Sequence, residues 1–244
     1  RESINHMSKL TTEATFINQN FSQQVLMSKE KTFSFKEPTS PFGGESEPAP
    51  VGYRYRKFVL GKPPSNKEDP DQRVQMLVRT ELDGVMAGKN EGDDDLMLRL
   101  YALNEVDAKL SNGIDWRQKL ESQRGAVLAT ELKNNSAKLA KWTLQATLAG
   151  ADMIKLGFVS RNHPRDSYNH VILGTQTYKP KEFATQINLN LNNAWGILKG
   201  IIDLCLDLDE GRYLLLKDPN KPVMRLYTIP QDAFVELESE ENDA

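Results

Sequence analysis

Short segments of alternating apolar and polar residues follow one another in adjacent pairs along this chain, and only a few helical segments separate them. Alternation with a period of two is typical of β-strands, and pairs joined by short turns favour hairpins over βαβ units. We therefore predict a mixed α/β (α+β) domain, in which two packed, largely antiparallel mixed β-sheets are flanked by helices. The predicted strands cover residues 53–60, 73–82, 96–106, 126–133, 153–160, 170–178, 211–217 and 224–229.

Helices are expected where apolar residues recur every three or four positions. This spacing predicts an amphipathic helix over residues 4–28 and a long helix over residues 181–208. Between them, residues 136–149 have helical spacing. Ser136 suits the N-cap of that helix and Gly150 suits its C-terminal stop.

Composition limits the class of protein and its surroundings. The 244 residues have a net charge of −3, so a nucleic-acid surface must be a local basic patch. The single cysteine, Cys205, excludes an internal disulfide and fits a reducing compartment, either cytosolic or nuclear, and we predict a cytoplasmic location. No run of about eighteen apolar residues is present, so we predict no membrane span. We predict one domain over residues 1–230 and a disordered acidic tail over residues 231–244, and interpret the chain as part of a longer protein.

Two short charged segments about fifty residues apart carry the candidate chemistry. If both are strands, Glu81 and Asp83 point to one face, and Glu131 and Lys133 also share a face. Carboxylate oxygens suit Mg²⁺ or Mn²⁺, and a lysine can steady a phosphate. The pattern indicates a divalent-metal site that handles a phosphodiester. The alternative is that these side chains form an ordinary exposed strand face and a surface ion pair.

The order of these segments resembles the decapping exoribonuclease family. The Glu-x-Asp at 81–83 and the Glu-Leu-Lys at 131–133 are followed by a Lys-Leu-x-Lys-Trp-x-x-Gln helix segment from 138 and by a Gly-Phe pair at 157–158. The resemblance implies that fold. By matching position it implies metal ligation by Glu81, Asp83 and Glu131, and phosphate contacts by Lys133 and Gln145.

One position departs from that family's pattern. The family carries Gly-Tyr-x-Phe-Glu, whose glutamate is another metal-site acid, and this chain has Arg56 at the matching position. Two unit charges about 4 Å apart interact by roughly 4 kcal/mol at a dielectric constant of about 20. Replacing the glutamate with an arginine turns this attraction for a metal ion into a repulsion. We therefore expect a vestigial site with no cofactor, or with weakly bound Mg²⁺ or Mn²⁺, in which Arg56 and Lys133 hold a phosphate. Alternatively, Arg56 points to solvent as part of a basic strand edge.

Longer segments are similar to the D subunits of eukaryotic translation initiation factor 3. The resemblance implies a non-catalytic domain that binds the 5′ cap or 5′ untranslated region of selected mRNAs. It also implies that other subunits of the factor and the small ribosomal subunit are partners. The segments that carry it lie at residues 3–6, 10–18, 53–56, 115–120, 122–127, 131–136, 170–176, 193–198 and 216–221.

The same resemblance assigns an RNA-binding face to the first helix. Thr15, Asn18 and Gln19 are spaced i, i+3, i+4, and the apolar stripe is expected to point away from them. Their short donors and acceptors suit the sugar, phosphate and base edges of RNA. The other interpretation is a solvated helix face without a ligand.

Three functions follow from these observations. The first is a binding-only module for RNA 5′ ends, because Arg56 replaces a metal-site acid. The second is a metal-dependent RNA 5′-end hydrolase that tolerates Arg56. The third is a structural subunit that contacts proteins and never touches RNA.

Overall fold

The computed structural model describes residues 3–27, 32–33, 52–64, 73–88, 90, 92–107 and 114–233. The chain divides into two compact units, residues 1–194 and 195–244, which are described separately. The single domain predicted over residues 1–230 stays a prediction. Residues 234–244, most of the predicted acidic tail, lie outside the described residues.

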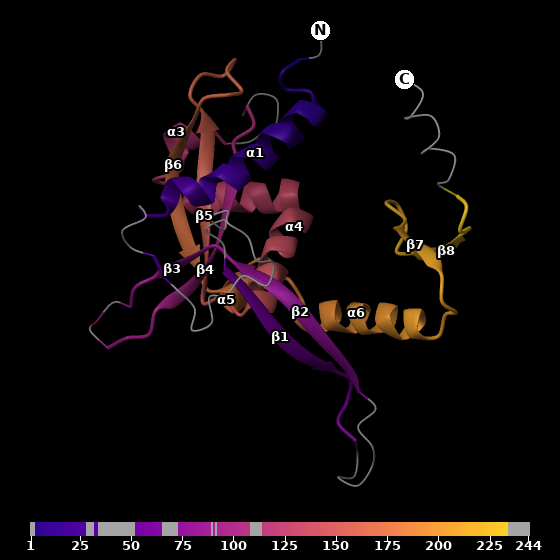
Figure 1. The fold of residues 1–244 in the computed structure, drawn as a ribbon. Helices are drawn as coiled ribbons and strands as arrows, with labels where there is room; N and C mark the ends of the chain where they lie inside the picture. The colour runs from indigo at the N-terminus through magenta and orange to yellow at the C-terminus, as the bar shows by residue number, and fades with distance from the viewer. Residues whose placement is uncertain are drawn as a thin grey trace, which may run out of the picture. The chain divides into compact units, whose positions relative to one another are not determined.

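The larger unit alternates helices with strands in a mixed α/β arrangement, as predicted (Figure 1). In the described part of the chain, β3 to β6 form a four-stranded sheet in sequence order, and β1 and β2 form a separate hairpin. The elements are α1 (Met7–Val25), β1 (Gly52–Leu60), β2 (Val74–Leu82), β3 (Gly84–Met86), β4 (Leu96–Asn104), α3 (Trp116–Lys119), α4 (Arg124–Ala149), β5 (Met153–Arg161), β6 (His170–Tyr178) and α5 (Pro180–Gln186).

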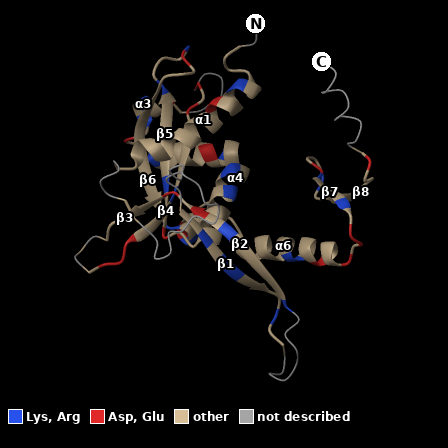
Figure 2. Ribbon diagram, in the orientation of Figure 1, with Lys and Arg blue, Asp and Glu red and all other residues tan. Residues whose placement is uncertain are grey.

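Both antiparallel and parallel pairs occur in the four-stranded sheet. The β3–β4 and β5–β6 pairs are antiparallel, whereas β4 and β5 are parallel. A parallel pair needs a crossover connection, and α3 and α4 supply it. The β1–β2 hairpin is antiparallel and brings Tyr53 opposite Glu81. Figure 2 shows Lys and Arg along this hairpin, and Asp and Glu gathered in the loop between β3 and β4.

One face of the four-stranded sheet packs against α1. Leu98, Leu100 and Ala102 alternate along β4 and join Phe21 of α1 in one apolar cluster. Phe21 approaches β5 so closely that a Cβ at Gly157 would lie 2.2 Å from its ring. A glycine is therefore required at position 157 for α1 to seat on the sheet.

The opposite face of the sheet carries the larger core. Tyr101 and Leu103, the β4 residues between those that face α1, pack with Leu139 and Trp142 of α4 and Phe158 of β5. Each large apolar side chain buried in this way contributes roughly 1.5–3 kcal/mol relative to an exposed one. The sheet is thus covered by helices on both faces, and β4 takes part in both cores.

The predicted strand over residues 126–133 is wrong, because these residues form the first half of α4. Burial here has a helical spacing, with Val127, Leu128 and Glu131 buried and the residues between them more exposed. Ser136, predicted as the N-cap of this helix, lies instead inside α4, just after a kink at Asn135, which has φ −130° and ψ 31°. The predicted stop at Gly150 is confirmed by its left-handed φ of 61°.

The helix predicted over residues 181–208 is divided in two. α5 ends at Gln186, and α6 (Leu191–Leu206) begins after Asn188, which has a φ of 54°. Asparagine visits the left-handed region more readily than most residues, so the chain turns here instead of continuing as one helix. Among the described residues, no helix is both long and apolar enough to cross a lipid bilayer.

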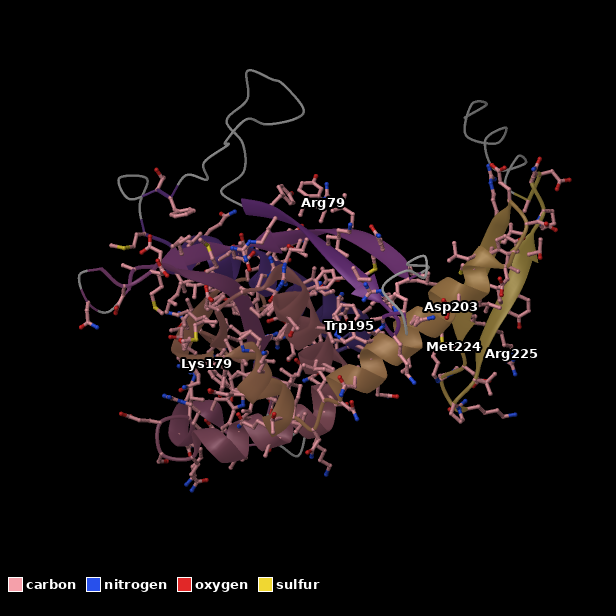
Figure 3. The ribbon with its side chains drawn as sticks, turned by 90° about the horizontal axis from the view of Figure 1, so that it is seen from below. Arg79, Lys179, Trp195, Asp203, Met224 and Arg225 are labelled. Carbon is pink, nitrogen blue, oxygen red and sulfur yellow. The ribbon has the colours of Figure 1, made fainter. Side chains whose placement is uncertain are left out.

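The smaller unit contains most of α6 and a hairpin of β7 (Arg212–Lys217) and β8 (Met224–Ile229), which confirms the predicted closing hairpin. Asp218 organises the turn, because its Oδ1 accepts hydrogen bonds from the backbone amides of Asn220 and Lys221. Its Oδ2 lies 3.2 Å from Nη1 of Arg225, a residue of β8 that is labelled in Figure 3. An ion pair therefore ties the turn to β8.

Candidate functional site

An arginine lies between the two acids of the Glu-x-Asp segment. Asp83 separates β2 from β3, and its Oδ2 accepts a hydrogen bond of 2.7 Å from the Leu100 amide. Its Oδ1 lies 3.0 Å from Nη1 of Arg99, a residue of β4. The same Nη1 lies 3.6 Å from Oε2 of Glu81. The sequence-predicted convergence of Glu81 and Asp83 is therefore present, and a guanidinium lies between them.

This arrangement does not fit a divalent ion. A Mg²⁺ or Mn²⁺ ligand must direct free oxygen lone pairs at the metal. Here one oxygen of Asp83 is engaged by a backbone amide and the other by the Arg99 guanidinium. Among the described residues, no group of three or more His, Cys, Asp or Glu side chains is placed to hold a metal ion. Any ion between Glu81 and Asp83 would have to displace Arg99.

The polar contacts continue from Arg99 towards α4. Arg99 Nε donates to the Tyr101 hydroxyl at 3.2 Å, and that hydroxyl donates to Oε1 of Gln145 at 3.2 Å. The Tyr101 ring stacks on Trp142 with centroids 4.7 Å apart, and Nζ of Lys138 lies 5.0 Å from the centroid of the Trp142 ring. Gln145, which we predicted to contact a phosphate, is thus connected to the acids through Arg99 and Tyr101. Neither of these two residues was selected from the sequence.

Burial shifts the pKa of several of these groups. Burial raises the pKa of the Asp83 carboxyl, and the charge of Arg99 and the Leu100 amide oppose that rise. For Arg99, burial favours the neutral form, but the nearby Asp83 and Glu81 carboxylates and the Tyr101 hydroxyl together outweigh burial and raise the pKa. Burial also raises the pKa of Tyr101, so its hydroxyl stays protonated and able to donate. The network therefore consists of the Asp83–Arg99 ion pair, which is linked through the Tyr101 hydroxyl to the side-chain amide of Gln145.

Glu131 and Lys133 do not share a face, which corrects the prediction made from strand geometry. On a helix, residues two apart point to roughly opposite sides. Glu131 is buried and accepts a hydrogen bond of 2.8 Å from Nδ2 of Asn135, whereas Lys133 is exposed. Burial raises the pKa of Glu131 and lowers that of Lys138, the cation whose charge favours the Glu131 carboxylate.

The prediction that Arg56 takes the place of a metal among the acids is wrong. Its Nη1 donates to the carbonyl oxygens of Thr147 and Leu148, at 3.0 and 2.8 Å. These carbonyls belong to the last turn of α4, where the helix leaves its C=O groups without intrahelical partners. The guanidinium between Glu81 and Asp83 is that of Arg99, from a different strand.

Arg54 extends the same contact. It lies two residues before Arg56 on β1, and its Nη1 donates to the carbonyls of Ala149 and Gly150, both at 3.0 Å. The last turn of α4 has no basic residue of its own, so β1 supplies two cations to the negative end of the helix dipole. A Cβ at Gly150 would lie 2.9 Å from the Arg56 guanidinium, so close approach and positive φ both require glycine there.

The predicted RNA face of α1 is only partly free. Thr15 and Gln19 are exposed. Asn18 turns towards the sheet, where its Oδ1 accepts a hydrogen bond of 2.9 Å from the Ala102 amide of β4. The expectation that all three side chains point away from the packed face is therefore wrong for Asn18. RNA contacts by Thr15, Asn18 and Gln19 stay predictions.

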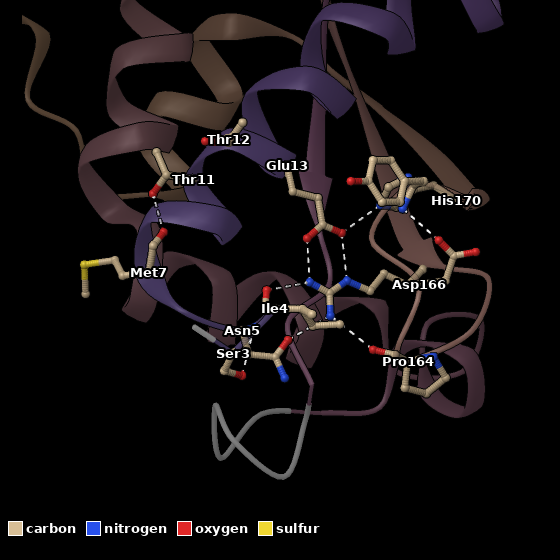
Figure 4. A network of polar contacts seen from close by, with 12 residues as sticks. Ser3, Ile4, Asn5, Met7, Thr11, Thr12, Glu13, Pro164, Asp166 and His170 are labelled. Atoms are coloured by element: carbon tan, nitrogen blue, oxygen red, sulfur yellow. Dashed lines mark hydrogen bonds and ion pairs between the residues drawn. The ribbon is translucent and has the colours of Figure 1, made fainter. Parts of the chain in front are cut away.

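A second buried ion pair anchors the start of α1 (Figure 4). Glu13 is buried on the same helix face as Ile17, and its two oxygens lie 2.5 Å from Nη2 of Arg161 and 2.7 Å from Nε2 of His170. Burial favours the protonated acid, but the hydrogen bonds from Arg161 and His170 outweigh it and lower the pKa of Glu13.

Sequence reasoning missed both buried pairs, although each left a signal. Glu13 lies four residues before Ile17 on the apolar stripe, a position where an unpaired charge is not tolerated. Arg99 interrupts an otherwise apolar strand in the same way. A charged residue at a core position predicts a buried partner, but the sequence does not name that partner.

The fold and site define a mixed α/β domain in which an arginine of the same chain lies between two paired carboxylates. A family model described as "Eukaryotic translation initiation factor 3 subunit 7 (eIF-3)" matches residues 1–228. The chain belongs to this family, which confirms the resemblance to the initiation-factor subunits.

Individual relatives belong to the same initiation factor. The chain is 54% identical over 245 residues to the D subunit of eukaryotic translation initiation factor 3 from Nasonia vitripennis, covering 99% of this chain and 41% of the relative. It is 55% identical to the corresponding protein of Bombyx mori, with 98% and 42% covered. The chain therefore spans about two fifths of the length of these relatives.

A solved structure of Scheffersomyces stipitis Rai1, in complex with (3′-NADP)⁺ and calcium ion, matches 68% of this chain and 40% of its own. The identity is 21% and the TM-score is 0.41. That similarity is too low to support an inference.

Proposed function

We propose that this chain is an RNA-binding part of a D subunit of translation initiation factor 3. It holds the 5′ cap end of selected mRNAs without cleaving them and promotes initiation on the small ribosomal subunit in the cytoplasm. Its partners are the mRNA 5′ region, other subunits of the factor and the small ribosomal subunit. Family membership supports the place in translation, and the position of Arg99 supports binding without cleavage.

The single observation that carries the absence of hydrolysis is the Arg99 guanidinium between Glu81 and Asp83. Metal-assisted cleavage of a phosphodiester needs an ion to generate the nucleophile and to stabilise the developing charge. Arg99 lies where such an ion would bind the two carboxylates, and a guanidinium does not activate water as a metal ion does. The vestigial site therefore has a structural role and needs no cofactor.

The RNA contacts are assigned to exposed side chains on separate elements. Thr15 and Gln19 on α1, with the half-buried Asn18 beside them, offer polar groups for the cap end, and Lys133 on α4 offers a cation for phosphate. Arg56 and Gln145 act indirectly, because both are engaged in contacts within the fold. The side chains that bind RNA directly therefore lie outside the Glu81–Asp83 pair.

A cleavage assay tests the catalytic part of the proposal. Capped and 5′-monophosphate RNAs are incubated with the chain in Mg²⁺ or Mn²⁺, and released cap and nucleotides are separated by chromatography. We expect no release. Release that disappears in Glu81→Gln, a change at an exposed acid, would overturn the proposal in favour of a metal-dependent hydrolase.

Crosslinking with cap-labelled RNA tests the binding part. We expect the double variant Thr15→Glu with Gln19→Glu to lose most of the crosslink, because two new anions repel phosphate. The matched control is Gln24→Glu, an exposed change on another side of α1 that adds one anion. Crosslinking that is absent from the parent chain, or unaltered in the double variant, would favour a structural subunit.

A further inference from the structure

The two faces of the β1–β2 hairpin differ sharply in composition. Side chains alternate along β1, and Arg54 and Arg56 point towards α4. Tyr53 and Tyr55 therefore point the other way, and they are 51% and 60% exposed. This outer hairpin face consists of Tyr53, Tyr55, Lys57, Val59, Gln75, Leu77, Arg79 and Glu81.

Cations flank the aromatic rings on the outer hairpin face. Arg79 lies directly across the hairpin from Tyr55, and Lys57 follows Tyr55 on the same strand face. Both cations are exposed, and Figure 3 shows Arg79 projecting from the side of the hairpin away from α4. The acid on this face, Glu81, lies within 3.6 Å of Arg99. The face is therefore aromatic with a basic balance.

The guanidinium of Arg79 already stacks on an aromatic plane. Its Cζ lies 5.0 Å from the centroid of the Tyr53 ring. Tyr53 and Tyr55 are two residues apart on one strand, so their attachment points are about 7 Å apart. Nucleobases stack on tyrosine rings and on arginine planes, and each base in an extended strand can take one such plane.

We propose that the outer hairpin face is a stacking platform for single-stranded RNA, which binds bases on Tyr53 and Tyr55 and phosphates on Lys57 and Arg79. This inference rests on the proposed RNA-binding function and adds a second contact, independent of the cap end. The platform reads no particular sequence, because every base offers a flat face. It would hold the strand that continues from the cap.

The mixture of groups favours RNA over a protein partner. The core of a protein interface is depleted in lysine, whereas Lys57 lies on the same face as the two tyrosine rings here. Leu77 provides the discriminating residue, since it is 72% exposed on the same face and has no ring or charge. A protein packed on this face would bury Leu77 with the tyrosines, whereas stacked bases do not depend on it.

Fluorescence anisotropy with an uncapped single-stranded RNA of twelve nucleotides tests the platform. We expect Tyr55→Ala to weaken binding by roughly 5- to 100-fold, the range found for loss of one base–aromatic stack. Tyr55→Phe keeps the ring and should leave the affinity unchanged, and so should Leu77→Ala. Lys57→Gln should reduce the slope of log affinity against log salt by about 0.7, as expected for one phosphate contact on a single strand.

The outcomes separate the platform from the proposed cap-end function. If Tyr55→Ala binds uncapped RNA within twofold of the parent, or Leu77→Ala weakens it equally, the platform is overturned. A parent chain that binds capped RNA but not uncapped RNA also overturns the platform and leaves the proposed function standing. Loss of both kinds of binding in the parent removes both proposals. Thermal melts of Tyr55→Phe and Tyr55→Ala show whether the fold is retained.

Discussion

Arg99 holds its guanidinium 3.0 Å from the Asp83 carboxylate, and the side chains of the two residues are only 8% and 15% exposed. Two charges removed from water are each costly, so each depends on the other and on the hydrogen bonds around them. Because Asp83 also binds the Leu100 amide, the pair fixes the junction of β2 and β3 against β4. The counter-ion of Asp83 therefore comes from the chain itself.

Removing that charge should both destabilise the chain and create a metal site. We predict that Arg99→Ala lowers the free energy of unfolding by about 3 kcal/mol, because Asp83 is left buried without its counter-ion. Mn²⁺ should then raise the melting temperature of Arg99→Ala and leave the parent unchanged, since the ion replaces the missing cation. Urea unfolding and melting with and without Mn²⁺ measure both effects.

Arg79→Ala is the matched control, because Arg79 is an exposed arginine of the same hairpin. Its free energy of unfolding should stay within about 0.5 kcal/mol of the parent, with no response to Mn²⁺. A parent chain stabilised by Mn²⁺ as strongly as Arg99→Ala would contradict the view that Arg99 replaces an ion.

The Tyr101 hydroxyl should contribute measurably to stability. It links Arg99 Nε to Gln145 Oε1, and Tyr101→Phe leaves both groups without that partner while the ring still stacks on Trp142. We predict a loss of about 1–2 kcal/mol in the free energy of unfolding. Tyr53→Phe, a change at an exposed ring, should have no such effect, and an equal loss in both variants would argue against the network.

Acid should selectively weaken the anchor of α1. The pKa of Glu13 is lowered below its ordinary value of 4.5, so in acid the unfolded chain takes up a proton before the folded one. The ion pairs therefore stabilise the fold fully above pH 4.5, and this contribution is lost as pH falls through the lower folded pKa. We predict that Glu13→Gln costs about 3 kcal/mol at pH 7 and much less at pH 3.

Urea unfolding of parent and Glu13→Gln at both pH values measures this difference. Glu182→Gln is the control, because Glu182 is 71% exposed in a surface pair with Lys179. It should change stability by less than about 0.5 kcal/mol at either pH. A cost of Glu13→Gln that is independent of pH would show that the carboxylate charge is not what Arg161 and His170 bind.

Sequence periodicity predicted most of the fold, because strands such as β1 and β2 alternate clearly between more exposed and more buried positions. It failed for residues 126–133, where a short run of alanine, valine and leucine suits either a strand or a buried helix. The assumed strand geometry then placed Glu131 beside Lys133. The local sequence of a short apolar run does not decide between strand and helix, because that choice depends on packing against residues far away in the sequence.

The candidate site was predictable only in part for a related reason. The convergence of Glu81 and Asp83 follows from local strand geometry, and the structure has it. The partners of buried charges are set by register between strands and by helix placement, which bring Arg99 to Asp83 and Arg56 to α4. We predicted that Arg56 lies beside the acids, whereas the structure has Arg99 in that place.

Gly150 should tolerate no side chain. Its φ is +61°, and a Cβ would lie 2.9 Å from the Arg56 guanidinium. We predict that Gly150→Ala lowers the free energy of unfolding by about 1–2 kcal/mol through left-handed strain and displacement of the arginine. Gly125→Ala is the control, since Gly125 lies in α4 with open space around it. That change should be neutral or slightly stabilising in the same denaturation experiment.

Reversing the charge of Arg56 should damage α4 and not restore a metal site. In Arg56→Glu, a carboxylate would face the Thr147 and Leu148 carbonyls at the negative end of the helix dipole. We predict a loss of about 2 kcal/mol in the free energy of unfolding and no gain in Mn²⁺ affinity by calorimetry. Lys57→Glu, the neighbouring change on the outer hairpin face, should leave stability nearly unchanged. Tight Mn²⁺ binding by Arg56→Glu would instead place position 56 among the acids and return the site to the metal-dependent class.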